Sequence, residues 1–140
     1  MQTLCIVPAI LANMKIEDLF KQHIQIRQST TEKILAKHKF DSLILNVGAP
    51  MVYFADNMEA PYRHTPHFAH WVPGKGPHHV LVIEPAKKPK LKYFYPLDFW
   101  YEHHDIKKEF WTAEFDIEIF HDLPKLHASV KGGKNTCLIG

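Results

Sequence analysis

The strongest constraint on this chain is a long amphipathic segment that leads directly into a short, wholly apolar run. Between Lys15 and Lys39, side chains suited to one helix face recur at steps of three and four, which predicts an amphipathic helix: Ile16, Leu19, Phe20, His23, Ile24, Arg27, Thr31, Ile34, Leu35 and His38. The apolar run Leu43–Leu45 is typical of a strand covered on both faces. Gly48 and Pro50 then indicate a loop. A helix, a buried strand and a loop in this order indicate an α/β domain.

The remaining elements are predicted from β-rich runs and from their proline and glycine signals. Residues 79–84 and 91–95 flank the turn segment 85–89 and predict an antiparallel hairpin with a basic tip. These runs, added to the first strand, predict a mixed β-sheet flanked by helices. The other expected elements are strands at 117–120 and 136–139, a helix at 123–131 between them, a helical turn at 51–55, a short strand at 68–72 and a short helix at 107–113.

Length and composition narrow the function classes. The chain has 140 residues, about one domain, with 46% hydrophobic and 23% charged residues, an ordinary globular composition. A net charge of +2 argues against a nucleic-acid partner or an anionic membrane surface. No apolar stretch approaches the ~20 residues of a membrane span. Cys5 and Cys137 cannot form a disulfide framework, so a cytoplasmic location is the default expectation.

The two ends of the chain differ from the rest. Residues 1–14 contain a short apolar stretch that Pro8 interrupts and that no Lys or Arg precedes. We therefore expect a poorly ordered extension rather than a signal peptide, and place the domain at residues 15–140. The chain stops at Cys137–Gly140, within or directly after a predicted buried strand. Because domains seldom end on such an element, we expect a fragment of a longer polypeptide.

The sequence contains no recognisable catalytic constellation, since neither a nucleophile motif nor a phosphate-binding loop occurs. His64, His67 and His70 form the densest group among eleven histidines. Their spacing matches no zinc motif, so we favour surface histidines over a metal site. The pairs at 78–79 and 103–104 indicate a loop or a sheet edge. A standalone histidine-rich metal-binding or protein-interaction module is the alternative function, and a self-contained small enzyme is a third hypothesis.

Aromatic side chains are dense between Tyr93 and Trp111. They could stack on single-stranded nucleic acid, but such platforms lie in a basic groove. Here Glu102, Asp105 and Glu109 are interleaved with the aromatic residues. A core or a protein interface is therefore the favoured interpretation.

Several segments together form a distinctive pattern. The longest and most unusual is Lys88-Pro89-Lys90-Leu91-Lys92-Tyr93-Phe94-Tyr95-Pro96-Leu97-Asp98-Phe99-Trp100. The others are His23-Ile24 with Arg27-Gln28, residues 40–44, residues 66–73, Phe110-Trp111 and residues 115–118. In these segments, and over Lys15 to Gly140 as a whole, the chain resembles the N-terminal domain of bacterial Xaa-Pro dipeptidases (prolidases). The branch that includes organophosphorus acid anhydrolases is the most similar.

The resemblance implies a creatinase-type α/β domain with a mixed β-sheet flanked by helices and a ribonuclease H-like motif. It also implies a two-domain parent enzyme that acts in the cytoplasm as a homodimer. The parent's C-terminal pita-bread domain would hydrolyse Xaa-Pro dipeptides with two divalent metal ions, usually manganese. No metal ligand and no catalytic residue carries over to this chain. The N-terminal domain would support dimerisation and wall off the partner's active site.

The resemblance also singles out three residues as candidate substrate contacts across the dimer. In relatives, the stretch corresponding to Tyr53–Asn57 can carry an acidic pair, one member of which reaches toward the amino end of the substrate. This chain has Asp56 but carries Asn57 at the second acidic position, which removes one formal charge. The alternative is that Asp56 only caps a turn. Trp71, in the matching segment 66–73, is the third candidate.

Overall fold

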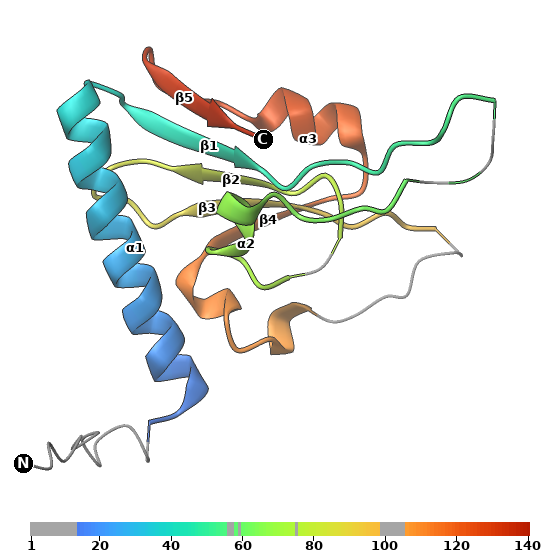
Figure 1. Cartoon of the computed structure of the whole chain (residues 1–140). Coiled ribbons are helices and arrows are strands. Elements are labelled where there is room, and N and C mark those ends of the chain that lie inside the picture. Colours follow the sequence, from blue (N-terminus) through green and yellow to red (C-terminus); the bar gives the residue numbers. More distant parts are fainter. Residues whose placement is uncertain (1–13, 56–57, 59, 75, 99–105) are drawn as a thin grey trace, which may run out of the picture.

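The computed structural model describes residues 14–55, 58, 60–74, 76–98 and 106–140. The strands of this part of the chain form one mixed sheet in the order β4-β3-β2-β1-β5 (Figure 1). The pairs β1/β2 and β2/β3 are antiparallel, and β1/β5 and β3/β4 are parallel. The elements in chain order are α1 (Ile16–His38), β1 (Ser42–Asn46), α2 (Pro66–Ala69), β2 (Val80–Ile83), β3 (Lys90–Phe94), the 3-10 turns η2 (Ile106–Lys108) and η3 (Thr112–Glu114), β4 (Asp116–Phe120), α3 (Leu123–Ser129) and β5 (Thr136–Ile139).

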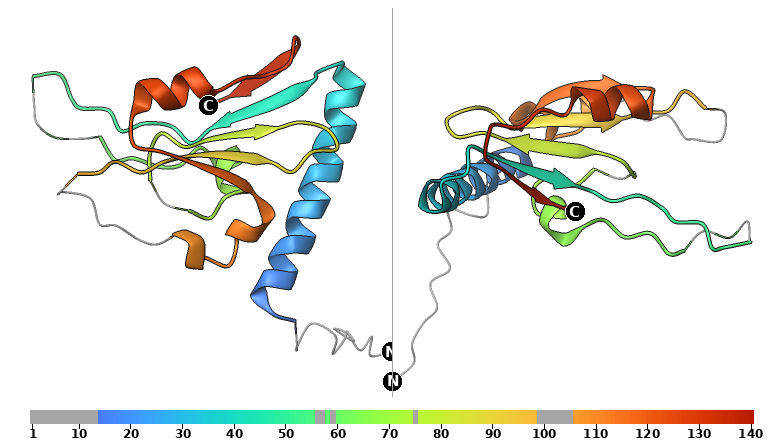
Figure 2. Two further views of the ribbon diagram at one scale, coloured as in Figure 1. Left: turned by 180° about the vertical axis from the view of Figure 1, so that it is seen from behind. Right: turned by 90° about the horizontal axis from the view of Figure 1, so that it is seen from above.

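Helices cover both faces of the sheet (Figure 2). On one face, Leu81 and Ile83 of β2 pack in a core that also contains Ile24 of α1 and Phe68 of α2. On the other face, Val80 and Val82 pack with Leu126 of α3 in a second cluster. All four β2 residues are therefore buried, which explains the continuous apolar run in the sequence. The predicted mixed-sheet α/β fold is confirmed.

Helix α1 is tied to the turn between β2 and β3. The Glu32 carboxylate accepts a hydrogen bond from the Ala86 N–H at 2.9 Å, and Gln28 Nε2 donates to the Lys87 carbonyl oxygen at 2.9 Å. These polar contacts hold the helix across the end of the hairpin while Ile24 and Leu35 enter the interior. The long predicted helix thus forms as expected and gains its orientation from the hairpin.

Three short predictions were wrong. Residues 51–55 do not form a helical turn. The Tyr53 N–H donates to the Met58 carbonyl oxygen at 3.0 Å and the Ala60 N–H donates to the Met51 carbonyl oxygen at 2.7 Å, as in a hairpin, and residues 54 and 55 lie in a turn. Residues 66–69 form the helical turn α2 instead of contributing to a strand at 68–72. Pro66 starts this turn, where its missing N–H leaves no helical hydrogen bond unmade. The helix expected at 107–113 is replaced by the two 3-10 turns η2 and η3.

His79 shows burial that its sequence pattern did not indicate. It lies directly before β2, in the expected loop or edge position, but only 1% of its surface is exposed. Its Nδ1 accepts a hydrogen bond from the Phe94 N–H at 3.1 Å, and its ring stacks on Tyr93 with 4.0 Å between centroids. The side chain therefore links the start of β2 to the end of β3.

Some expectations lie outside the described residues. These are residues 1–13 of the expected extension, the His103-His104 pair and the aromatic residues 99–101. Among the described residues, none of the helices combines the length and the apolar character that crossing a membrane requires.

The edge strand β5 is held to β1 by a buried hydroxyl as well as by backbone pairing. Ser42 is fully buried, and its Oγ lies 2.9 Å from Thr136 Oγ1. The same Oγ accepts a hydrogen bond from the Gly133 N–H at 3.0 Å. Ser42 therefore joins the first residue of β1 to the start of β5 and to the loop that precedes it.

Replacing Ser42 with alanine should weaken this junction. The change removes the acceptor of the Gly133 N–H and the partner of Thr136, so we expect the free energy of unfolding to fall by about 1–2 kcal/mol in urea denaturation. Ser29→Ala, on the exposed surface of α1, is the matched control and should stay within about 0.5 kcal/mol of the wild type. Equal losses in the two variants would contradict this account.

Candidate functional site

The most distinctive feature outside the sheet is an arm that leaves the end of β1 and returns to α2. Its described residues, within the range 49–63, are 49–55, 58 and 60–63. It projects well beyond the sheet in both Figure 1 and Figure 2. The chain enters the arm through Gly48, whose φ of 99° is a conformation that favours glycine. Asn46 Oδ1 accepts a hydrogen bond from the Gly48 N–H at 2.9 Å and supports this bend. The direction of the arm is therefore set where β1 ends.

Side-chain hydroxyls fix the base of the arm. The Tyr62 hydroxyl lies 3.3 Å from the carbonyl oxygens of both Val47 and Gly76. Thr65 Oγ1 donates to the Val47 oxygen at 3.2 Å, and the Thr65 N–H donates to the same oxygen at 3.0 Å. Burial raises the pKa of the Tyr62 hydroxyl, so the group stays protonated and able to donate. These contacts join the two ends of the arm to β1 and to the loop before β2.

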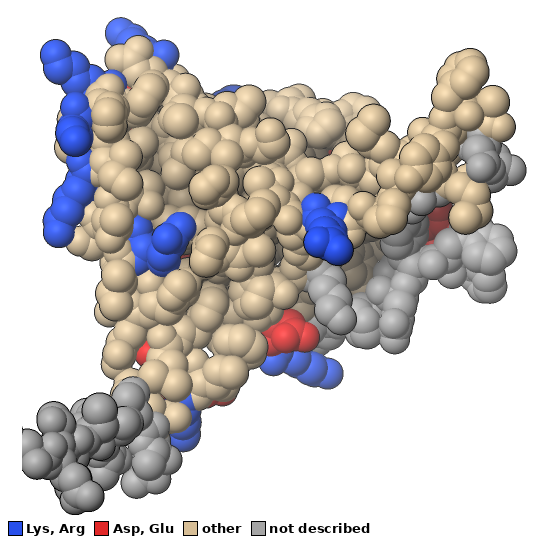
Figure 3. Space-filling view, in the orientation of Figure 1, with Lys and Arg blue, Asp and Glu red and all other residues tan. Residues whose placement is uncertain are grey.

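The described residues toward the tip of the arm are apolar and exposed. Phe54 is 100% exposed, and Met51, Val52, Tyr53 and Met58 are also exposed. Figure 3 shows the described part of the tip without charged side chains, whereas lysine and arginine side chains gather along the α1 side of the molecule. Contiguous exposed apolar groups on a soluble domain usually mark an interaction site. An apolar tip on a hydrogen-bonded base is suited to insertion into the surface of another protein.

Of the three predicted site residues, the structure describes only Trp71. Asp56 and Asn57 lie between Phe54 and Met58 in the sequence and are outside the described residues. Trp71 is only 1% exposed and packs in the core between the sheet and α1. The guanidinium carbon of Arg27 lies 5.9 Å from the centroid of the Trp71 ring. Trp71 lines the groove beside α1.

Sequence reasoning missed the residues that build the arm. The sequence predicts a helical turn at residues 51–55, although Pro50 and Pro61 bracket this stretch. An apolar run between two prolines, with no amphipathic pattern, was the available signal for an exposed hairpin. The roles of Tyr62 and Thr65 had no signal, because both side chains bond to backbone atoms that only the folded chain places nearby.

The clustered histidines do not meet at one point. His64 packs against Tyr62 with 5.4 Å between ring centroids, whereas His67 lines the groove beside α1. The carbonyl oxygen of His70 accepts a hydrogen bond from His23 Nε2 at 2.7 Å. In the part of the chain that the structure describes, no three His, Cys, Asp or Glu side chains are grouped so that they could hold a metal ion. The described residues therefore do not fit a metal centre of their own.

Comparison with known proteins gives consistent matches. A family model described as the N-terminal domain of Xaa-Pro dipeptidase matches residues 18–140. The Xaa-Pro dipeptidase of Proteus mirabilis is 32% identical over 132 residues, which cover 90% of this chain and 29% of that protein. The enzyme of the same name from Pseudoalteromonas haloplanktis is 34% identical over 75% of this chain and 24% of its own length, and that of Sodalis glossinidius is 30% identical over 89% and 28%. The chain spans about a quarter of the length of these curated relatives.

Tyr62→Phe should loosen the arm while the sheet stays intact. The change removes the hydroxyl that reaches Val47 and Gly76, so we expect faster amide exchange within residues 49–63, measured by hydrogen–deuterium exchange. Tyr53→Phe removes a hydroxyl from the exposed tip and is the matched control, with exchange expected to match the wild type. The prediction fails if the two variants exchange alike.

Two histidines at the base of the arm should make stability depend on pH. Burial lowers the pKa of His64, and burial followed by the charge of His127 lowers that of His78. As the pH falls below about 6.5, the unfolded chain binds protons before the folded chain does. The free energy of unfolding should therefore decrease from about pH 6.5 downward through the lowered folded pKa values.

The test compares the wild type with a His64→Gln/His78→Gln double variant in urea titrations at several pH values. We expect the variant to lose stability less steeply between pH 7 and pH 5. Measurements at pH 8, where both rings are neutral, supply the reference for each protein. Identical slopes in the two proteins would contradict the assignment.

Proposed function

Because this chain belongs to the Xaa-Pro dipeptidase N-terminal domain family, we propose that it shapes and encloses the active site of a parent Xaa-Pro dipeptidase. Family membership confirms the resemblance inferred from the sequence. The mixed-sheet fold also agrees with a creatinase/prolidase N-terminal domain. In this proposal the domain assembles and shields the catalytic centre, and catalytic groups come from the rest of the parent.

The chemistry of the parent is assigned to residues outside this chain. We propose that a C-terminal domain hydrolyses Xaa-Pro dipeptides with two divalent metal ions, and manganese is the first metal to test. The names of the relatives and the share of their length that the chain covers support this division. We place the parent in the cytoplasm, where a free thiol such as that of Cys137 stays reduced.

The arm is the observation that carries the role of this domain. Its exposed apolar tip is suited to burial against a second subunit, and its base holds it in one direction. We propose that the parent is a homodimer in which each arm reaches the active site of the other subunit. Phe54 would anchor the tip, and the neighbouring Asp56 and Asn57 would face the amino end of the dipeptide. The carboxylate and the amide oxygen both accept hydrogen bonds from an ammonium group.

Phe54→Ser in the full-length parent tests this role. Burying a phenylalanine side chain contributes about 1.5–3 kcal/mol, so we expect the dimer dissociation constant to rise about tenfold or more and kcat/KM on a Xaa-Pro dipeptide to fall. Analytical ultracentrifugation and steady-state kinetics measure the two effects. Ile26→Ser removes an exposed apolar side chain from α1 and is the matched control, expected to change neither quantity.

Two results would contradict the proposal. One is a Phe54→Ser parent with the dimer stability and the kinetics of the Ile26→Ser control. The other is appreciable hydrolysis of a Xaa-Pro dipeptide by the purified 140-residue chain with added manganese, because catalysis would then lie within this domain.

A further inference from the structure

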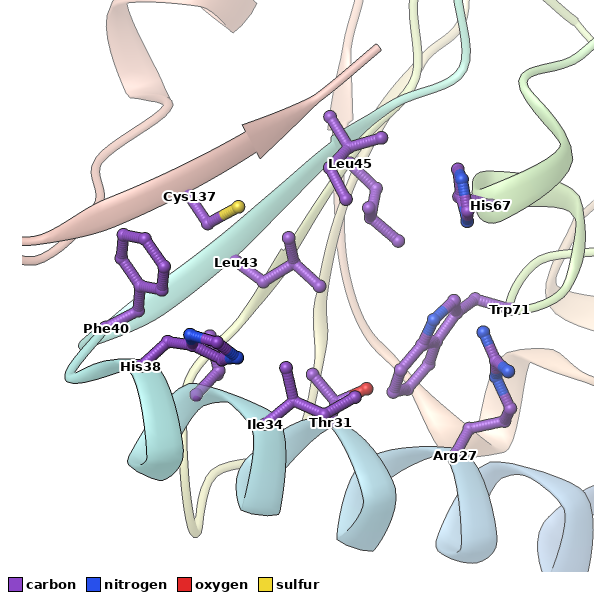
Figure 4. Close-up of a pocket in the computed structure, with 12 residues that line it drawn as sticks. Arg27, Thr31, Ile34, His38, Phe40, Leu43, Leu45, His67, Trp71 and Cys137 are labelled. Atoms are coloured by element: carbon purple, nitrogen blue, oxygen red, sulfur yellow. The ribbon is translucent and has the colours of Figure 1, made fainter.

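A groove with a volume of about 200 Å³ lies between α1, α2 and the β1–β5 side of the sheet (Figure 4). Leu43 and Leu45 of β1 form much of its floor, and the sulfur of Cys137 on β5 points toward Leu43. Arg27 and His38 of α1 stand at its opposite ends. The groove is thus mainly apolar, with basic side chains at its two ends.

The described chain leaves this part of the sheet incompletely covered. The strands β2 and β3 lie in the centre of the core, whereas Leu43, Cys137 and Ile139 are only half-buried. Ile34, on the α1 side of the groove, is 54% exposed. Burying these apolar side chains would be favourable, at roughly 25 cal/mol for each Å² removed from water. The core therefore has room to extend on the β5 side.

The edge of the sheet at β5 lacks the usual protection against further pairing. Among the described strands, β5 pairs only with β1, and its residues Thr136–Ile139 include no charge and no proline. Leu138 is 70% exposed. Natural proteins usually blunt such an edge with charges or prolines, or cover it with another segment. Because β5 has neither charges nor prolines, we expect another segment to cover it.

The groove also has a charge preference. Its lining contains Arg27, His38 and His67 but no acidic residue. Arg27 Nε is buried and has no hydrogen-bond partner among the described residues. A buried donor without an acceptor is costly, and a carboxylate is the acceptor that suits a guanidinium group best. The matching occupant is an apolar segment that carries an aspartate or a glutamate.

We infer that the polypeptide following this domain in the parent packs into the groove and along β5, with a carboxylate on Arg27. The relatives supply such a polypeptide, because this chain matches an N-terminal domain and spans about a quarter of their length. Ile139, the last residue of β5, itself lines the groove, so a chain continuing from β5 starts beside it. The inference rests on the proposed parent but not on its catalytic activity or on the arm.

The thiol of Cys137 reports directly on the groove. In a Cys5→Ser background, the labelling rate of Cys137 with a thiol reagent is measured in the 140-residue chain and in the full-length parent, and the Cys137 peptide is quantified by mass spectrometry. We expect labelling at least tenfold slower in the parent. Equal rates would overturn the inference. Slow labelling in the 140-residue chain that speeds up on dilution would also overturn it, because a second copy would then be the occupant.

Reversing the charge of Arg27 on α1 tests whether a segment packed in the groove, rather than another cause, slows the labelling of Cys137. Arg27→Glu in the parent should bring Cys137 labelling to within about threefold of the rate in the 140-residue chain. Lys33→Glu makes the same charge change at an exposed α1 position that does not line the groove, and should leave the parent protected. Urea denaturation checks that each variant folds, and Arg27→Gln replaces Arg27→Glu if the reversal prevents folding. Protection that survives loss of the Arg27 charge would refute the assigned carboxylate contact.

The outcomes also distinguish this inference from the proposed function. A parent that protects Cys137 but does not cleave Xaa-Pro dipeptides would refute the proposed function and support the packing inferred here. An active parent with rapid Cys137 labelling would overturn the packing alone.

Discussion

Burial of the central strands on both faces is the constraint on which the rest of this structure depends. Leu81 and Ile83 face the core under α1 and α2, while Val80 and Val82 face α3. A sheet of this kind must receive helices on each side, since exposing either face would leave a row of apolar side chains in water. The buried hydrogen bond between His79 and Phe94 belongs to the same arrangement, because it joins the start of β2 to the end of β3, the two strands of the hairpin.

The features of functional interest lie where the sheet is no longer covered by helices on both faces. Beyond the carboxyl end of β1, the chain leaves the sheet through Gly48 and forms the arm, whose described apolar side chains are exposed at its tip. Along β5, the sheet ends at an uncharged edge beside a half-open groove. Both are apolar surfaces at the margin of an otherwise complete core. A domain that completes its packing against other parts of an assembly would have such margins, as the proposed role requires.

The sequence predicted the regular elements well and the irregular ones poorly. The α1 helix and the β2–β3 hairpin carry strong local signals, namely a 3.6-residue period and a proline-bounded basic turn, and both are confirmed. The segment 51–55 has no period, so its pairing depends on one hydrogen bond from Tyr53 to Met58 and one from Ala60 to Met51, which no local rule indicates. Trp71 was selected by resemblance alone, and its burial between the sheet and α1 is a property of packing.

The sequence by itself determined the α/β class, the main helices and strands, and the family. Periodicity and long motifs such as residues 88–100 involve only residues that are close together in the chain, so they can be recognised without the folded structure. Only the tertiary structure decided that β5 lies at the edge of the sheet among the described strands, that His79 is buried and that the described residues after β1 stand out as an arm. Each of these depends on contacts between residues far apart in the chain. The Tyr62 hydroxyl, for example, meets the Val47 and Gly76 carbonyl oxygens only after β1 and the loop before β2 have come together.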